Sequence, residues 1–207
     1  MFIKDNSTVL FQGDSVTDCG RDYSDLNSFG CGYPLKVSQY FNTFLSNKNV
    51  KFINKGISGS RAIDLKARWR QDCIDLKPDY VSIMIGINDC WRRYDNNEIT
   101  TAEAFENNYR FILNEIKTKT NAKIIILEPY VLPVTLDKIT WREDLDPKIQ
   151  KARQLAREFN AIYIPLDGLF ASQISNINPE QFSQDGVHPT DMGHAFIAKT
   201  FIDYVTK

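Results

Sequence analysis

Ser15 stands where a serine can act as a nucleophile. It follows the apolar run Val9–Phe11 and a turn made by Gly13 and Asp14, so its hydroxyl and backbone N–H are expected at the end of a β-strand. A serine hydroxyl attacks a carbonyl carbon effectively only when a neighbouring base takes its proton. Gly-Asp-Ser also occurs in ordinary turns, so the chemistry of Ser15 depends on partners elsewhere in the chain.

Asp185 and His188 can supply that base. The sequence holds only two histidines, and His188 follows a carboxylate by three residues across Gly186. A tight turn at this glycine can direct Asp185 to one ring nitrogen, which leaves the other nitrogen to accept the proton of Ser15. The alternative is a surface turn with a bystander histidine. The second histidine, His194, falls within an expected helix and is predicted to be structural.

Two further residues can stabilise the oxyanion that such an attack creates. Gly56 is expected to offer a backbone N–H after a strand, and Asn88 to offer a side-chain amide. One such donor typically contributes ~3–4 kcal/mol in the transition state. Taken singly, Gly56 is also consistent with a plain strand-ending turn and Asn88 with a helix cap. Taken together with the nucleophile, they predict an oxyanion hole formed by Ser15, Gly56 and Asn88.

Apolar strands alternate with amphipathic helices along the chain. The predicted strands are Thr8–Gln12, Val50–Asn54, Tyr80–Ile85, Ala122–Leu127 and Ala161–Pro165. The predicted helices are Tyr33–Leu45, Ala62–Leu76, Ala102–Lys117, Pro147–Phe159 and Asp191–Val205, with a loop from the last strand to about Pro189. The third and fourth strands are almost entirely apolar, which is typical of strands buried on both faces.

Strands separated by helices of this length imply parallel pairing through crossovers. The predicted fold class is α/β: a three-layer α/β/α sandwich with a five-stranded parallel sheet of flavodoxin-like order, in a single domain over residues 1–207. Ligands of such sheets bind beyond the carboxyl ends of the strands. Ser15, Gly56 and Asn88 each follow such an end, so the fold would bring them to one edge.

Together these segments resemble the SGNH hydrolases, or GDSL esterase/lipase superfamily, named for Ser, Gly, Asn and His in chain order. The matching blocks are Gly13-Asp14-Ser15, Gly56, Gly86-Ile87-Asn88-Asp89 and Asp185-Gly186-Val187-His188. The resemblance spans most of the chain and implies an SGNH hydrolase fold, a catalytic triad of Ser15, Asp185 and His188, and no metal or organic cofactor. Val16 stands where the name-giving motif has Leu. The lack of Gly-x-Ser-x-Gly around the serine distinguishes the chain from the α/β-hydrolase fold.

A finer resemblance is to the intracellular acetylxylan esterases of this superfamily. It is carried by residues 13–20, 54–59, 65–69 and 81–92. It implies a serine esterase that removes O-acetyl groups from xylo-oligosaccharides or related acetylated sugars through an acyl-enzyme intermediate, as a monomer or a homo-oligomer. Glu128-Pro129-Tyr130 differs from the Thr-Pro-Phe expected at that place, which leaves the exact substrate open.

The predicted substrate contacts are Trp91, Arg92, Tyr94 and Tyr130. All four are expected in loops just after strand ends, where an aromatic face can lie against a sugar ring. Packing of the loops, or an interface between copies of the chain, would explain the same residues equally well.

The composition excludes several classes of partner. Twenty-five Lys and Arg against 26 Asp and Glu give a net charge of −1, so the chain has no overall basic field for nucleic acid or an anionic membrane. The apolar runs are too short to span a bilayer, and the first is too short for a signal peptide. A cytoplasmic protein is therefore predicted, with its four cysteines, none in a CxxC pair, as reduced thiols.

Three alternative functions stay open at this point. The same site would serve a lysophospholipase, a thioesterase or a short-chain lipase, because a fold does not fix a substrate. Paired carboxylates would serve a glycoside hydrolase, although no pair has as specific a placement as Ser15 and His188. A binding module that has lost catalysis is the third, and the filled triad and oxyanion positions argue against it.

Overall fold

The protein, seen in a computed structural model, is described over residues 1–206; Lys207, the last residue of the domain predicted over 1–207, lies outside the described residues. Within this range one parallel sheet has the strand order β2-β1-β3-β4-β5. Its strands are β1 (Thr8–Gly13), β2 (Lys51–Asn54), β3 (Tyr80–Met84), β4 (Lys123–Leu127) and β5 (Ile162–Ile164). The predicted three-layer α/β class and flavodoxin-like order are confirmed.

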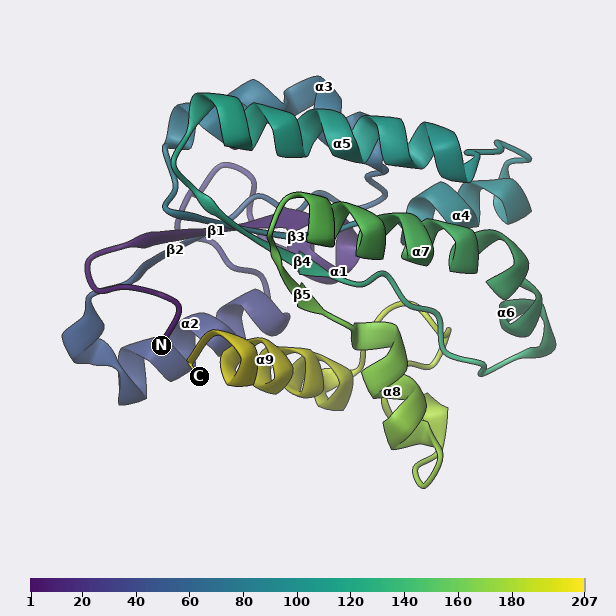
Figure 1. The fold of residues 1–207 in the computed structure, drawn as a ribbon. Helices are drawn as coiled ribbons and strands as arrows, with labels where there is room; N and C mark the ends of the chain where they lie inside the picture. Colours follow the sequence, from purple (N-terminus) through teal and green to yellow (C-terminus); the bar gives the residue numbers. More distant parts are fainter. Residues whose placement is uncertain (207) are drawn as a thin grey trace.

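Helices cover both faces of the sheet (Figure 1). One face carries α3 (Ala62–Asp72), α5 (Ala102–Lys119) and α7 (Arg142–Glu158), and the other carries α2 (Tyr33–Phe44) and α9 (Asp191–Thr206). The shorter helices are α1 (Ser15–Asp18), α4 (Ile87–Asp95), α6 (Leu136–Thr140) and α8 (Leu166–Ile174), with 3₁₀ turns η1 (Ser46–Lys48), η2 (Ile74–Leu76) and η3 (Pro179–Gln181). None of the helices between residues 1 and 206 has the length and apolar character needed to cross a membrane.

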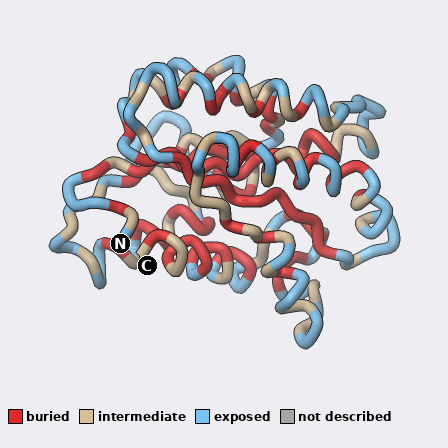
Figure 2. Tube along the Cα trace, in the orientation of Figure 1, coloured by how far each residue is buried: buried red, intermediate tan, exposed pale blue. Residues whose placement is uncertain are grey.

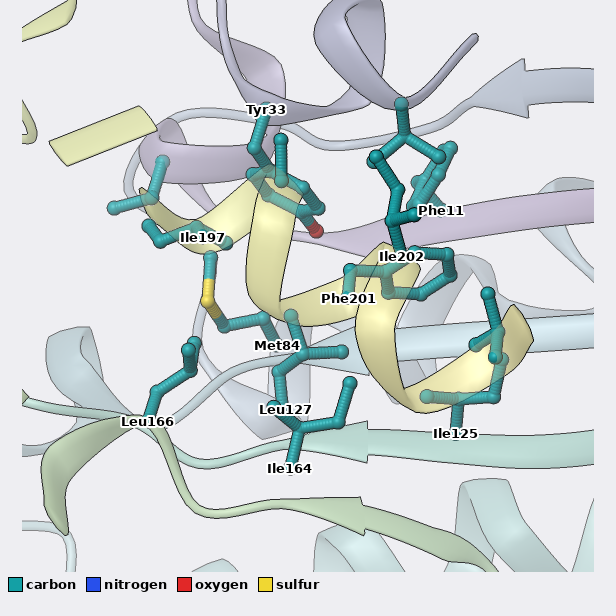
Figure 3. Packing of buried hydrophobic residues seen from close by; sticks show 14 of the residues in the cluster. Phe11, Tyr33, Met84, Ile125, Leu127, Ile164, Leu166, Ile197, Phe201 and Ile202 are labelled. Atoms are coloured by element: carbon teal, nitrogen blue, oxygen red, sulfur yellow. The ribbon is translucent and has the colours of Figure 1, made fainter. Parts of the chain in front are cut away.

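The core is split into two layers by the sheet. Successive strand residues point to opposite faces, so Phe11 packs with α2 and α9 while its neighbour Leu10 packs with α3 and α5. All of β3 is buried, as its apolar run predicts, and Figure 2 shows the buried strands along the middle of the molecule. In Figure 3, Phe201 of α9 lies over the strands beside Phe11. This packing fixes the strand ends from which the polar loops emerge.

Helices α4 and α8 lie where the sequence predicts loops. The first turn of α8 is held by Glu128, whose Oε2 accepts the N–H groups of Asp167 and Gly168 at 3.0 and 3.4 Å. This cap comes from the end of β4, so no local sequence signal marks the start of α8. Helix α4 has only nine residues, which is too short for a helical period to be recognised in the sequence.

Helix α7 starts earlier than its predicted first residue, Pro147. It begins at Arg142, and the proline lies inside the helix. Glu143 and Asp144 in the first turn complement the positive end of the helix dipole, and buried Leu145 anchors this turn in the core. Proline is favoured at a helix start, but tertiary packing decides the boundary here.

We expect Phe11→Ala to lower the free energy of unfolding by about 3–5 kcal/mol, because it removes a fully buried ring. The Phe11 ring lies 5.5–5.9 Å from those of Tyr33, Phe52 and Phe201, which come from three other elements. Urea unfolding measures the change. Phe44, 70% exposed at the end of α2, is the matched control, and Phe44→Ala should cost about 0.5 kcal/mol or less. Equal losses in the two variants would contradict this packing.

Candidate active site

A chain of hydrogen bonds joins Ser15, His188 and Asp185. The Ser15 hydroxyl lies 2.9 Å from Nε2 of His188, and Nδ1 of the same ring lies 2.6 Å from Oδ2 of Asp185. Because Oδ2 of Asp185 accepts a hydrogen bond from the Nδ1–H group, Nε2 carries no proton and can accept the hydroxyl proton of the serine. The imidazole is about half exposed, so a substrate can reach it from solvent. This arrangement can activate a hydroxyl group for attack on a carbonyl carbon.

The turn between β1 and α1 positions Ser15 at the end of the strand. Asp14 caps the short helix, since its Oδ1 accepts the N–H of Val16 at 3.0 Å. Gly13 is required because a Cβ there would lie 2.3 Å from Oγ1 of Thr17 and 2.6 Å from the carbonyl oxygen of Met84. Gly13 therefore allows the turn to pack closely, and Asp14 caps the helix. Together they place the hydroxyl of Ser15 at the edge of the sheet.

Asp185 both builds the turn that carries His188 and binds its ring. Oδ1 accepts the backbone N–H groups of Val187 and His188 at 2.9 and 2.7 Å, and Oδ2 accepts the ring N–H. The turn passes through Gly186 at a φ of +84°. It is tied to the loop after β4, because the Leu132 N–H donates to the carbonyl of Gly186 at 2.8 Å. The three-residue spacing thus lets one aspartate stabilise the turn and orient the histidine ring at the same time.

The two carboxyl groups near His188, those of Asp14 and Asp185, have different pKa values. Burial raises the pKa of Asp14 to about 7, against the Val16 hydrogen bond and the nearby imidazole, which lower it. Burial would also raise the pKa of Asp185, but hydrogen bonds from His188 and Val187 outweigh it and hold that pKa well below its usual range. The hydrogen bond that the His188 ring donates to Asp185 raises the pKa of His188 above 6.5. Asp185 is therefore the carboxylate that stays charged beside the imidazole.

Gly56 does not have the free N–H that the sequence analysis predicted. Its N–H donates to Oδ1 of Asn54 at 2.9 Å, and the residue is buried. The same asparagine donates to the carbonyl of Thr17 at 2.7 Å. A Cβ at Gly56 would lie 2.5 Å from the backbone nitrogen of Asp18. The prediction for Gly56 is thus corrected: this glycine lets the β2 loop pack against α1.

Gly59 has the free N–H instead, and sequence reasoning missed it. It lies in the exposed turn that the Ser60 N–H closes on the carbonyl of Ile57 at 3.2 Å, and its own N–H has no acceptor among residues 1–206. Asn88 donates to the carbonyl of Ser60 at 3.1 Å, which leaves its second amide hydrogen. Over the same range the Ser15 N–H also has no acceptor. We infer an oxyanion hole formed by Ser15, Gly59 and Asn88.

Of the predicted substrate contacts, Trp91 comes closest to the triad. Its ring lies 5.6 Å from that of His188, and the ammonium group of Lys138 lies 5.3 Å from the Trp91 ring. Trp91, Arg92 and Tyr94 lie on α4 and not in a loop, because the chain becomes helical directly after Gly86.

The other three predicted contacts bind neighbouring groups of the protein, and the guanidinium of Arg92 lies 6.0 Å from the Trp91 ring. Arg92 pairs with Asp95 on its own helix, and Tyr94 stacks on Trp141 with ring centroids 5.1 Å apart. Tyr130 is only 4% exposed, and its hydroxyl donates to the carbonyl of Val187 at 3.0 Å. The expectation for Tyr130 is thus corrected: it supports the turn that carries the histidine. Within residues 1–206, no group of three or more His, Cys, Asp or Glu side chains is arranged to hold a metal ion.

The sequence is similar to those of known hydrolases. Residues 11–196 match the GDSL-like Lipase/Acylhydrolase family. An acetylxylan esterase of Geobacillus stearothermophilus is 34% identical over 209 residues, which cover 98% of this chain and 95% of that protein.

Two solved structures have the same overall fold as this chain. The crystal structure of Axe2, an acetylxylan esterase from Geobacillus stearothermophilus, superimposes with a TM-score of 0.93 and 32% identity, over 100% of this chain and 97% of the other. A putative GDSL-like lipase from Parabacteroides merdae superimposes with a TM-score of 0.93 and 33% identity, over 99% and 97%.

We expect NMR titration to separate the two histidines. His188 should titrate above pH 6.5, because the hydrogen bond that its ring donates to Asp185 favours the charged form of the imidazole. His194 should stay neutral down to about pH 4, because burial lowers its pKa. A general base must be neutral, so kcat/KM should fall on the acid side with the midpoint of His188. Asp185→Asn should move that midpoint downward, and a wild-type His188 titrating at or below 6.5 would contradict this assignment.

We expect Asn88→Ala to lower kcat about 10²–10³-fold, because the variant loses one oxyanion donor that acts in the transition state. Hydrolysis of 4-nitrophenyl acetate by wild type and variant measures the effect, and an unchanged circular dichroism spectrum shows that the variant is folded. A kcat within threefold of wild type would remove Asn88 from the oxyanion hole.

Proposed function

The chain belongs to the GDSL-like lipase/acylhydrolase family and is a carboxylic ester hydrolase, and we propose that it removes O-acetyl groups from xylo-oligosaccharides or related acetylated sugars. The observation that carries this proposal is the unbroken hydrogen-bond chain from Ser15 through His188 to Asp185. The acetylxylan esterase of Geobacillus stearothermophilus, alike over nearly the whole chain, supports the substrate class.

Acylation begins at Ser15. Its oxygen attacks the acetyl carbonyl carbon while Nε2 of His188 takes the hydroxyl proton. Asp185 keeps its negative charge, because its pKa is held low, and stabilises the imidazolium that forms. Asn88 and the backbone N–H groups of Ser15 and Gly59 hold the oxyanion. The tetrahedral intermediate then collapses: the bond between the acetyl carbon and the sugar oxygen breaks, and the imidazolium protonates that oxygen. The sugar leaves as an alcohol, and the acetyl group stays on the serine.

Deacylation repeats these steps with water. His188 takes a proton from a water molecule, which attacks the acetyl-serine carbonyl, and the collapse of the second tetrahedral intermediate returns the proton to Ser15 and releases acetate. The half-exposed imidazole can receive this water directly from solvent. No step requires a group from outside the chain other than water.

Trp91 offers a surface for the sugar. It is half-buried on α4 beside the His188 ring, and Lys138 lies near it. An indole face can pack against the apolar face of a pyranose ring while the ring hydroxyls stay in solvent. This position suits the leaving sugar, because the proton that it receives comes from the adjacent imidazole.

We expect Ser15→Ala to lower the rate of acetate release from acetylated xylo-oligosaccharides at least about 10⁴-fold, because it removes the nucleophile. An acetate assay compares the wild type with this variant. Ser46→Ala, a change of an exposed serine in η1, is the matched control and should keep the wild-type rate.

The other outcomes separate the parts of the proposal. Release undiminished in Ser15→Ala would contradict the nucleophile and the mechanism. A wild type that cleaves 4-nitrophenyl acetate but not the sugar esters would contradict the sugar substrate, and acyl thioesters and longer-chain esters would then be assayed.

A further inference from the structure

Two cysteines that the proposed mechanism does not use lie beside each other near the active site. Cys19 ends helix α1, Cys31 precedes α2, and their sulfur atoms are 3.0 Å apart. Cys31 is exposed and Cys19 is partly buried, whereas Cys73 and Cys90 are buried in the core. Of the four thiols, Cys31 is therefore the one that an oxidant in solution meets first.

The backbone holds this pair together. The N–H of Cys31 donates to the carbonyl of Cys19 at 2.9 Å, and the Cys31 thiol contacts the same oxygen at 3.2 Å. Glycines on both sides of Cys31 allow this approach. A Cβ at Gly30, where φ is +66°, would lie 2.3 Å from the Asp18 carbonyl oxygen, and a Cβ at Gly32 would lie 2.8 Å from the Cβ of Cys19. The sulfur contact thus follows from the path of the main chain.

His194 adds a third group to the pair. Its Nδ1 accepts the N–H of Tyr33 at 3.2 Å, so a neutral ring carries its proton on Nε2. Nε2 lies 3.3 Å from the sulfur of Cys19 and donates to it. Burial lowers the pKa of His194 to about 4, which keeps the ring neutral. The histidine fixes the Cys19 sulfur in the position that faces Cys31.

The loop between the two cysteines braces the oxyanion region. Nε of Arg21 donates to the carbonyl of Gly56 at 2.7 Å. The Tyr23 hydroxyl donates to Oδ2 of Asp18 at 2.6 Å, and the same oxygen accepts the backbone N–H of Ser58 at 3.0 Å. A link between the ends of this loop would therefore restrain the turn that carries Gly59.

We propose that Cys19 and Cys31 form a reversible intramolecular disulfide that clasps the loop of residues 20–30 and stabilises the folded enzyme while the triad stays assembled. The oxidant is a low-molecular-weight disulfide. The thiolate of Cys31 attacks it, its S–S bond breaks, one thiol leaves, and a mixed disulfide forms on Cys31. The sulfur of Cys19 then attacks the Cys31 sulfur, and the second small thiol leaves with the proton of Cys19. The protein loses two electrons and two protons, and the small disulfide gains them as two thiols.

The disulfide is expected to raise the thermal stability. Closing a loop of this length reduces the entropy of the unfolded chain, and Tm should rise by roughly 5–10 °C. The sulfur atoms already lie side by side in the fold that has Ser15 bonded to His188. Esterase activity of the oxidised protein should therefore stay within about twofold of the reduced protein.

The test treats the reduced, purified protein with oxidised glutathione, and free thiols are then alkylated after denaturation. Mass spectrometry should show four alkylated cysteines before treatment and two after it, with a peptide that links residues 19 and 31. The Tm should rise on oxidation and return with dithiothreitol. Both readouts are independent of the substrate that the enzyme uses.

Two variants control the assignment. Cys19→Ser should keep glutathione on Cys31 as a mixed disulfide, because the resolving sulfur is gone. Cys31→Ser should take up no glutathione and show no change in Tm on oxidation. Glutathione retained on Cys31 of the wild type, a linked peptide without a rise in Tm, or loss of activity on oxidation would each overturn the proposal.

Discussion

The hydrogen bond between Ser15 and His188 joins residues that are 173 positions apart, and the fold is arranged so that both ends of this bond meet. The serine is fixed by β1, which pairs with β2 and β3 inside the sheet. The histidine is fixed by a turn just before α9, which packs against α2 on one face of the same sheet. Any change that moves α9 relative to β1 therefore acts on the reacting atoms, even when it lies in the core.

Burial assigns different roles to two carboxyl groups that act on the same imidazole. Asp14 has one backbone hydrogen bond in a buried place, and its pKa rises to about 7. Asp185 is less buried and accepts hydrogen bonds from the His188 ring and from two backbone N–H groups, so it stays ionised. Only a carboxylate that remains charged can stabilise the imidazolium during turnover. The environment of each carboxyl group, and not its residue type, thus separates the helix cap Asp14 from Asp185, the partner that we propose for His188 in catalysis.

The sequence predicts the sheet well because its signals there are local. The apolar runs of β3 and β4 are long enough to identify buried strands, and the crossover rules then leave few possible strand orders. The helix boundaries that the sequence predicts wrongly depend on contacts with residues far away in the sequence or in other elements. Helix α8 is capped by Glu128 from the end of β4, and α7 is anchored at Leu145 ahead of the proline that suggested its start. The residues of α8 do not reveal that Glu128 will cap it, and the residues of α7 do not reveal that Leu145 will be buried against other elements.

In the candidate site, too, local features can be predicted from the sequence and long-range contacts cannot. Asp185 and His188 form one turn with their own backbone, so their spacing predicts their pairing, whereas the availability of an N–H depends on what lies across the site. Gly56 follows a strand as an oxyanion donor would, but Asn54 accepts its N–H and α1 packs against its α-carbon. Three residues later the chain makes an exposed turn, and Gly59 keeps its N–H unbound within residues 1–206. The glycine nearest the strand end closes the packing against α1, and the glycine of the following turn is the one that we propose as the oxyanion donor.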